Sequence, residues 1–440
     1  MRPRIKVKPP GPRAKRTIFR DSMIISPSLT RELPLVVEKA YGSNIEDIDG
    51  NVYLDFASAV GVANIGHSNP DVVRAVSNQI KKVSHICFSD YYADIPVRFA
   101  ERLRDFLPKS LNRVFFSNSG AESVEAAMKL ARYHTKRKHF LAFYGAFHGR
   151  TFGALSLTAS KIAHKKNFGP LLPVVHSPYA YCYRCPFGKN QKDCDTECVR
   201  YIEDYVFKKE VPADEIAACF VEPIQGEGGY IVPPKKFHTN LKKLCEENGI
   251  LYVADEVQSG CFRTGRFLAS EHFGIVPDIV CLSKALGGGI PIGVTISSKK
   301  VMNWTTRTHA NTFGGNMLAC ASGLAVLDYF EQNNIGEKVE KDGKFALDFL
   351  DDLKGESKII GDVRGKGLMI GIELVKDKET KEPAVKERDM IVKEAFEKGL
   401  VLLSCGESSI RIAPPLTIER EELETGLEIL RNTILYSKLA

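Results

Sequence analysis

The most constraining feature of this 440-residue sequence is a repeated alternation of short apolar runs with longer stretches of helical periodicity. Each apolar run has the length of a buried strand, and most of these runs end in a polar or glycine-rich turn. This order is typical of an α/β fold, in which helices cover a largely parallel sheet. The prediction rests on the runs at 113–117, 139–143, 217–222, 249–255 and 278–283.

The end segments of the chain predict a second, smaller α/β domain. Amphipathic stretches alternate with shorter strands toward the C-terminus, and residues 35–56 predict a hairpin whose turn is Asp49-Gly50. The expected organisation is a basic arm at 1–20, an N-terminal segment of the small domain at 21–65, a large domain at 66–325 and the rest of the small domain at 326–440.

The formal charge of +7 has a local source, because the first twenty residues hold eight Lys or Arg and no acid. Without interleaved aromatic residues, this segment predicts a solvated arm, or one lying on a neighbouring subunit, and no nucleic-acid partner. No apolar run reaches the roughly 18 residues that a membrane span requires, and no signal-peptide pattern follows the basic residues. We therefore expect a cytoplasmic protein without a membrane partner.

Four of the eleven cysteines cluster in the segment CYRCPFGKNQKDCDTEC. Their spacing is compatible with a tetrahedral zinc site, although the link between the two pairs is short for a zinc ribbon. Disulfides and free thiols are the other interpretations, and the sequence leaves all three open. The residues concerned are Cys182, Cys185, Cys194 and Cys198.

An acid and an amine follow two of the predicted strands. Asp255 ends the run at 249–255, and Lys284 comes directly after the run at 278–283. Ligands in such sheets bind beyond the carboxyl ends of the strands, so both side chains are candidates for chemistry. Taken alone, they are more often a structural ion pair.

A third element, SNSGAE at 117–122, joins a strand to a helix and predicts a phosphate site. Ser119 and Glu122 have the spacing of a capping box, and Gly120 lets the backbone approach a ligand closely. The N–H groups of the first helical turn suit a phosphate. Amine, carboxylate and phosphate site together match pyridoxal 5′-phosphate (PLP), which needs a Schiff-base lysine and an acid beside its ring nitrogen. This set requires no metal.

The motifs FSNSGAE, FHGRT, VEPIQGEGG, ADEVQSGCFRTG, SKALGGG, NTFGGN and RIAPPL occur in that order. In them the chain resembles the class III PLP-dependent aminotransferases of fold-type I, which include 4-aminobutyrate, ornithine and acetylornithine aminotransferases, from about residue 35 to 435. The resemblance implies a homodimer with active sites at the subunit interface. It also implies ping-pong transfer of an amino group, from an ω-amino acid such as 4-aminobutyrate to 2-oxoglutarate.

The resemblance assigns a role to most of the cofactor-binding residues. Lys284 would hold PLP covalently and carry the proton, Asp255 would pair with the ring nitrogen, and Gln258 would bind the 3-oxygen. Phe147 would stack on the ring, and Thr312 resembles the threonine that reaches the partner's phosphate. The remaining expected cofactor-binding residues are Ser119, Gly120 and Ala121 at the phosphate, His148, and Glu222, whose role the sequence does not explain.

The resemblance also assigns the substrate-binding residues. Arg411 would bind the α-carboxylate and Arg150 the distal carboxylate, because a guanidinium binds carboxylates bidentately. Glu227 resembles the glutamate that neutralises Arg411 when the donor carries an ω-amine. Val60 falls where 4-aminobutyrate enzymes of the family carry an aliphatic residue and ornithine enzymes a tyrosine.

Two other functions remain open on the same scaffold. An amino-acid racemase or epimerase would use the same lysine and aspartate with a second base, and Glu227 favours transfer because some racemase-like members carry aspartate there. A non-enzymatic protein of this fold would not need the complete set of Lys284, Asp255 and Gln258.

Overall fold

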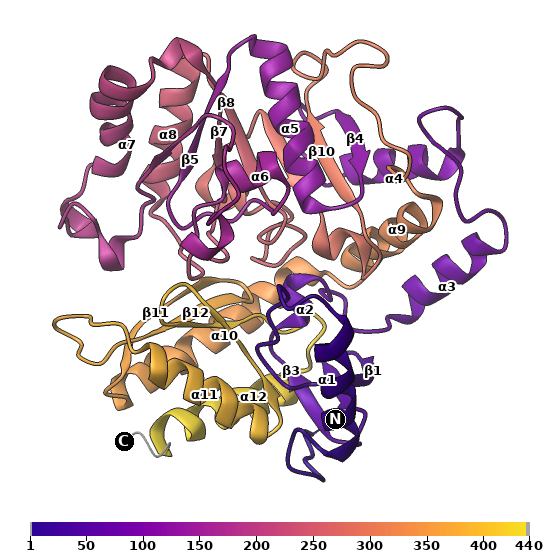
Figure 1. Ribbon diagram of the computed structural model, residues 1–440, viewed down its shortest axis with the longest axis vertical. Coiled ribbons are helices and arrows are strands. Elements are labelled where there is room, and N and C mark those ends of the chain that lie inside the picture. The colour runs from indigo at the N-terminus through magenta and orange to yellow at the C-terminus, as the bar shows by residue number, and fades with distance from the viewer. Residues whose placement is uncertain (1, 437–440) are drawn as a thin grey trace. The chain divides into compact units, whose positions relative to one another are not determined.

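The computed structural model describes residues 2–436, apart from the side chain of Asp193, and forms two compact units. Unit 1 consists of Met1–Asn69 and Glu337–Ala440, so the two ends of the chain fold together. Unit 2 is the continuous segment Pro70–Gly336. Figure 1 draws both units and labels their elements.

The centre of unit 2, within the described residues, is a seven-stranded sheet in the order β4-β10-β9-β8-β7-β5-β6. β10 runs antiparallel to both of its neighbours, and the other pairings are parallel. Four of the five predicted apolar runs contain one of these strands, and the run at 217–222 overlaps β7, which begins one residue earlier. The prediction of an α/β fold is confirmed. The strands are β4 (Arg113–Ser117), β5 (His139–Phe143), β6 (Val174–Ser177), β7 (Ile216–Val221), β8 (Leu251–Asp255), β9 (Ile279–Leu282) and β10 (Gly293–Ser297).

Helix α5 (Gly120–Thr135) lies across this sheet and contacts β7, β8, β9 and β10 (Figure 1). Its buried face includes Val124, Ala127, Met128 and Ala131, which pack against Phe140 and Phe220 of the sheet in one apolar core. The other helices of unit 2 are α3 (Pro70–Ile80), α4 (Asp94–Arg104), α6 (Phe152–Leu157), α7 (Glu197–Tyr201), α8 (Lys235–Glu247) and α9 (Met317–Gln332).

Unit 1 contains, in its described part, two four-stranded sheets. The first sheet has the order β1-β2-β3-β13 and the second the order β11-β12-β15-β14. The predicted hairpin at 35–56 is a three-stranded meander: Asp49-Gly50 connects β2 to β3, and Gly42 begins an additional turn between β1 and β2. The strands are β1 (Val37–Tyr41), β2 (Asn44–Asp47), β3 (Val52–Asp55), β11 (Ile360–Lys366), β12 (Met369–Leu374), β13 (Leu400–Val401), β14 (Leu403–Cys405) and β15 (Ser409–Ile412).

The basic N-terminal segment packs on this meander through backbone contacts, while most of its residues remain exposed to solvent. Arg4 forms backbone hydrogen bonds with Val52 in both directions, and the carboxylate of Asp49 accepts from the backbone N–H groups of Arg13 and Ala14. An acid at the start of helix α1 (Pro12–Ile24) satisfies N–H groups that have no partner within the helix. The other helices of unit 1 are α2 (Ser58–Gly61), α10 (Ile335–Glu356, which begins in unit 2), α11 (Val385–Glu397) and α12 (Arg420–Tyr436).

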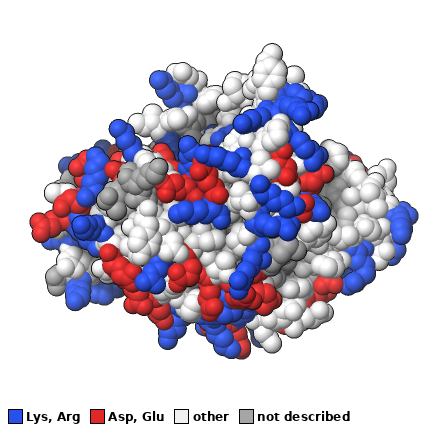
Figure 2. All heavy atoms as spheres, turned by 90° about the horizontal axis from the view of Figure 1, so that it is seen from below, with Lys and Arg blue, Asp and Glu red and all other residues white. Residues whose placement is uncertain are grey.

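Two surface properties bear on partners. No helix within residues 2–436 combines the length and the apolar character that a membrane crossing requires. Figure 2 shows one face of the molecule, on which Lys and Arg side chains are interspersed with Asp and Glu. The cationic side chains on that face therefore do not gather into a single field.

Candidate active site

The carboxyl ends of the central strands of unit 2 meet the N-terminus of α5. A Cβ atom on Gly120 would lie 2.8 Å from Val257 Cγ1, just after β8, and 3.5 Å from Ser283 Cβ, just after β9. Only a glycine fits there without displacing these neighbours. Ser119 Oγ accepts from Glu122 N at 3.2 Å, which is the predicted N-cap. The other half of the capping box differs, because Glu122 Oε2 accepts from Asn118 N at 2.7 Å.

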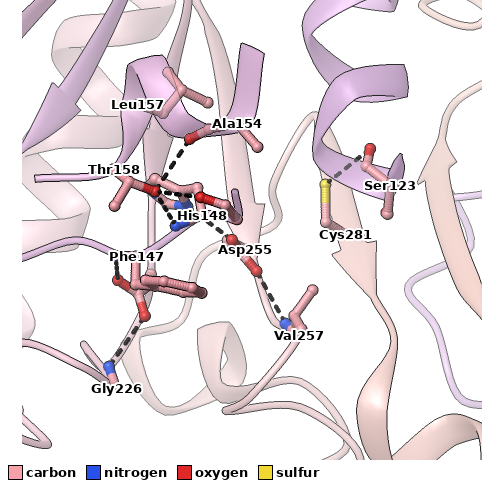
Figure 3. A network of polar contacts seen from close by, with 12 residues as sticks. Ser123, Phe147, His148, Ala154, Leu157, Thr158, Gly226, Asp255, Val257 and Cys281 are labelled. Atoms are coloured by element: carbon pink, nitrogen blue, oxygen red, sulfur yellow. Dashed lines mark hydrogen bonds and ion pairs between the residues drawn. The ribbon is translucent and has the colours of Figure 1, made fainter. Parts of the chain in front are cut away.

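A buried ion pair lies at the end of β8. Asp255 Oδ2 is 2.7 Å from His148 Nδ1, and Asp255 Oδ1 accepts from Val257 N at 3.1 Å (Figure 3). The backbone of His148 is held as well, because its N–H donates to Thr158 Oγ1 at 2.9 Å. The imidazole therefore has a fixed orientation toward the carboxylate.

Burial lowers the pKa of His148, but the hydrogen bond and the charge of Asp255 outweigh burial and raise that pKa above its usual value. The raised pKa favours an imidazolium, which stabilises Asp255 as a carboxylate. His148 Nε2 is buried and has no hydrogen-bond partner among residues 2–436. Asp255 is thus a buried, anionic acceptor at the end of a central strand.

Glu222, directly after β7, connects two loops of the site. Its Oε2 accepts from Phe147 N and its Oε1 from Gly226 N, both at 3.0 Å (Figure 3). Burial raises the pKa of Glu222 to about 7, although the charge of His148 opposes this shift. This carboxyl group fixes the FHG loop and the QGEGG loop relative to each other, which is the role that the sequence did not reveal.

Gln258 is buried beside the second of these loops. A Cβ atom on Gly226 would lie 2.6 Å from Gln258 Nε2, so a side chain at this position would displace the Gln258 amide. Gln258 Oε1 has no hydrogen-bond partner in the described part of the chain. Because an amide oxygen buried without a partner is costly, the site suits a polar ligand at this point.

Lys284 begins a short turn of 3-10 helix, Lys284–Gly287, after β9. Its φ of 38° lies in the left-handed region, which residues other than glycine rarely adopt. The preceding Ser283 donates its hydroxyl to the carbonyl of Ile292. Strained backbone of this kind is concentrated at functional sites, where the surrounding structure maintains it.

A second group of polar side chains surrounds Phe147. The guanidinium of Arg150 lies 5.7 Å from the centre of the Phe147 ring, and the ring of His164 meets the same ring edge-on at 5.7 Å. Burial lowers the pKa of His164, the charge of Arg150 lowers it further, and the charge of Glu227 raises it. Arg150 and Glu227 therefore lie close enough to influence one imidazole.

The loop of Thr312 is anchored at the end of β4. The side chain of Asn311 donates to Phe116 O at 2.9 Å, and its oxygen accepts from the backbone N–H of Gly314. Thr312 itself is exposed in the single chain. The anchored backbone presents the threonine outward.

Two of the expected substrate residues belong to unit 1. Arg411, on β15, is buried, and its Nε and Nη2 donate to Ser404 O at 3.0 and 2.7 Å. Val60 lies in the turn α2, with a φ of 62°. A β-branched residue in this region is a conformational outlier.

Several of the expected cofactor-binding residues lie together in unit 2. The contacts above bring together Gly120, Phe147, His148, Glu222 and Asp255 with the loops of Gln258 and Lys284 in unit 2. Gly149 adds Ala121, since a Cβ atom on Gly149 would lie 2.8 Å from Ala121 Cβ. Sequence reasoning missed Thr158 and His164, which no motif marks.

The residues of unit 2 fit a PLP cofactor. A buried amide, an acid paired with an imidazolium, a lysine and a helix N-terminus are the groups that PLP requires. The glycine contacts at Gly120 and Gly226 keep the backbone close to this space.

The cysteine segment lines a further cavity of unit 2. Cys182, Cys185, Cys194 and Cys198 line one cavity with Tyr179, and the structure describes all four as free thiols. Burial and the neighbouring Cys185 and Cys194 raise the pKa of Cys182 to about 11, which disfavours the thiolate. Within the described residues, no group of three or more His, Cys, Asp or Glu side chains is arranged to hold a metal ion.

Comparisons with known proteins give a consistent family. A family model described as aminotransferase class-III matches residues 25–434. A leucine/methionine racemase of Thermococcus litoralis is 42% identical over 91% of this chain and 90% of its own length. An alanine/serine racemase of Pyrococcus horikoshii is 39% identical over 98% and 92%. A 4-aminobutyrate aminotransferase of Mycobacterium leprae is 38% identical over 96% and 95%.

A solved structure supports the same comparison. An amine transaminase from an uncultivated Pseudomonas species, in its PLP-bound form, has a TM-score of 0.87 and 31% identity. The match covers 94% of this chain and 98% of that chain. The agreement extends through nearly the whole length of both proteins.

Proposed function

The chain belongs to the class-III aminotransferase family, and from this premise we propose that it transfers an amino group from an ω-amino acid such as 4-aminobutyrate to 2-oxoglutarate. The enzyme is a PLP-dependent aminotransferase, and the resemblance noted in its motifs is confirmed. The identity of the amino donor is the part that we propose.

Bound PLP supplies an aldehyde that condenses with amines and a ring that withdraws electrons from the carbon bearing the amine. We propose that Lys284 holds the cofactor covalently and, once the donor has replaced it, takes the proton from the donor carbon through Nζ. Asp255, kept anionic by His148, would hold the ring nitrogen protonated. Gln258 would donate its amide to the 3-oxygen, and the N–H groups of Gly120 and Ala121 would bind the phosphate.

The substrate assignments rest on charge. Arg150 would bind the distal carboxylate, and its position over Phe147 places a cation beside the expected cofactor ring face. Glu227 would neutralise Arg411 while an ω-amine donor is bound and would release that arginine when the keto acid enters. Val60 would contact the carbon chain of the donor.

The observation that carries the PLP chemistry of this proposal is the Asp255–His148 pair at the end of β8, because a buried anion maintained by an imidazolium suits the cofactor's ring nitrogen. The choice of an ω-amine donor is supported by the 4-aminobutyrate aminotransferase relative. The test is a panel of amine donors with 2-oxoglutarate, in which glutamate formation by the holoenzyme is followed. Lys284→Ala serves as the matched inactive control. Glutamate formation from 4-aminobutyrate that exceeds the rate with α-amino acids supports the proposal, and its absence with every ω-amine contradicts it.

A racemase is the second candidate, because two relatives at 42% and 39% identity are racemases. It would use Lys284 on one face of the substrate and a second base on the other, and Glu227 is the acid available for that role. The discriminating experiment supplies a single L-amino acid, such as leucine or alanine, without any keto acid. Formation of the D-enantiomer under these conditions favours the racemase, whereas a strict requirement for a keto acid favours transfer.

We also propose a homodimer in which Thr312 contacts the phosphate bound by the partner. The exposed position of Thr312 on an anchored loop supports this, as do the exposed apolar side chains of Phe19, Met23 and Ile24 on α1. The described cysteines are free thiols, which supports a reducing, cytoplasmic location. Sedimentation of the holoenzyme tests the dimer.

A further inference from the structure

The turn that carries Val60 has an unusual backbone. Four successive residues have positive φ: Ser58 at 48°, Ala59 at 50°, Val60 at 62° and Gly61 at 77°. Only glycine adopts this region without strain, and a β-branched side chain is the least suited to it. The rest of unit 1 must therefore maintain the turn.

Asp55 maintains the start of the turn. Its carboxylate is buried, and Oδ1 accepts from Ala57 N at 2.8 Å and from Ser58 N at 3.0 Å. Its Oδ2 lies 2.7 Å from His67 Nε2. His67 is fixed in turn, because its backbone forms hydrogen bonds with Gly42 in both directions, at 2.9 and 3.1 Å.

The same turn is bonded to the strand end that carries Arg411. Ser58 Oγ donates to Ala413 O at 2.6 Å, and Ala413 N donates to Phe56 O at 2.8 Å. Arg411 lies on β15, and Ala413 follows directly after the end of that strand. Arg411, the expected carboxylate ligand, and Val60, the expected apolar contact, thus lie on two segments of unit 1. Hydrogen bonds join these two segments.

We propose that Asp55, fixed by His67, is a positioning residue for substrate selection: it holds the left-handed turn so that Val60 keeps a constant offset from Arg411. The arginine would bind the substrate carboxylate, and the apolar side chain would contact the substrate's carbon chain at a fixed distance from the arginine. Together they would select substrates by the length of that carbon chain. A loosened turn would present Val60 at a range of distances from Arg411, and the selectivity for chain length would be lost. The inference rests on the proposed function, which assigns Val60 and Arg411 to the substrate.

The test compares Asp55→Ala with Asp55→Asn and with the matched control Asp47→Ala in the holoenzyme. Asp47 is another buried carboxylate of unit 1, and it accepts from Asp49 N, Asn51 N and Tyr53 OH. It closes the turn between β2 and β3 and makes none of the contacts that hold Val60. Both alanine variants should lower the thermal midpoint, so a loss of stability alone does not distinguish them.

Two selectivity measurements do distinguish them. The first gives kcat and KM for β-alanine, 4-aminobutyrate and 5-aminovalerate with 2-oxoglutarate. The second gives dissociation constants for propionate, butyrate and valerate, read from the cofactor absorbance. One methylene in an apolar pocket is worth about 10- to 200-fold, so Asp55→Ala should reduce the selectivity between neighbouring chain lengths by about tenfold, mainly through KM. Asp55→Asn should retain most of it, since its amide oxygen still accepts from Ala57 and Ser58.

Equal loss of stability in Asp55→Ala and Asp47→Ala, with unchanged carboxylate selectivity in both, overturns the proposal. So does a wild-type enzyme that binds the three carboxylates equally. If Asp55→Ala does not fold, His67→Gln decides, because it removes the second support of the carboxylate at a partly exposed position, and unchanged selectivity in that variant rejects the idea. Failure of the wild type to transfer any ω-amine would reject the proposed function instead, while the carboxylate constants still test Asp55.

Discussion

Both units contain a buried Asp–His pair with the same separation of 2.7 Å, yet the two pairs have different surroundings. In unit 2 the His148 side chain is completely buried and the pair faces the ends of the central strands. In unit 1 the His67 side chain retains 18% of its exposure, and the second oxygen of Asp55 holds two backbone N–H groups. The first pair sets a charge, whereas the second fixes a backbone conformation.

The comparison shows that a motif of two residues does not define a role. Asp255 has one backbone partner in addition to His148, and in the proposed function its carboxylate faces the cofactor's ring nitrogen. Asp55 has all of its described bonds directed to the protein, so in the proposal its effect on substrate passes through the turn that carries Val60. We therefore expect large effects on rate from unit 2 and moderate effects on selectivity from unit 1.

The largest effect is expected when the side-chain amine of Lys284 in unit 2 is removed. Lys284→Ala should abolish transamination, with a loss of at least about 10⁴-fold, because both the covalent anchor and the proton carrier are removed. The fold should persist, and PLP should still bind through its phosphate site. Steady-state glutamate formation and the circular dichroism of the variant measure these two outcomes. Substantial turnover would show that another residue is the base.

The next prediction compares the two aspartates directly. Asp255→Asn should lower the rate by about 10²- to 10⁴-fold, because an amide cannot hold the ring nitrogen protonated. Asp55→Asn should change kcat by less than about tenfold, since no charge at the reacting atoms depends on it. Parallel kcat measurements on the two variants are the test. Similar losses in both would remove the distinction between the pairs.

Glu222 tests whether the unit 2 network is governed by charge. Its pKa of about 7 in the folded protein lies above its usual value of 4.5, so the folded state holds a proton that the unfolded state has lost. The contribution of Glu222 to the free energy of unfolding should therefore decrease by at most about 3 kcal/mol as pH rises from 4.5 to 7. Above pH 7 this contribution should stay constant.

The measurement is the thermal midpoint of the holoenzyme between pH 5 and 8, for the wild type and for Glu222→Gln. Because the pKa of His148 is also raised, its contribution to protein stability declines as pH rises as well. Only the difference between the two proteins therefore reports on Glu222. The variant should show a smaller decline and a lower midpoint at pH 5, because an amide N–H₂ would oppose the N–H of Phe147 or Gly226. An identical decline in both proteins would mean that Glu222 ionises normally.

The smallest expected effect concerns Glu227, the group that links the two regions in the proposed function. Glu227→Ala leaves Arg411 to attract the carboxylate of α-amino acids, so the ratio of rates with glutamate to rates with 4-aminobutyrate should rise by about tenfold. Stopped-flow half-reactions measure each donor separately. An unchanged ratio would reject the proposed neutralisation of Arg411 by Glu227. If the rates with both donors fall and racemisation is lost as well, Glu227 would be identified as the second base of a racemase.

Local sequence features predicted the strands of unit 2 well. The runs at 139–143 and 113–117 are strands β5 and β4 with the same bounds, and the N-cap at Ser119 begins α5. β5 lies between two parallel neighbours, where burial selects an apolar run of this length, and the cap depends on residues three positions apart. The predicted hairpin lacked its third strand because Gly42-Ser43 is a weaker turn signal than Asp49-Gly50.

The sequence by itself determined the order of strands and helices, the positions of Asp255 and Lys284 at strand ends, and the family, because these depend on neighbouring residues and on motifs. Only the tertiary structure decided that His148 pairs with Asp255, 107 residues away, that Glu222 joins two loops, and that the basic N-terminus packs on Asp49. It alone places Val60 in a left-handed turn. The physical reason is that such contacts join segments distant in the chain, and a strained backbone persists only where those distant segments hold it.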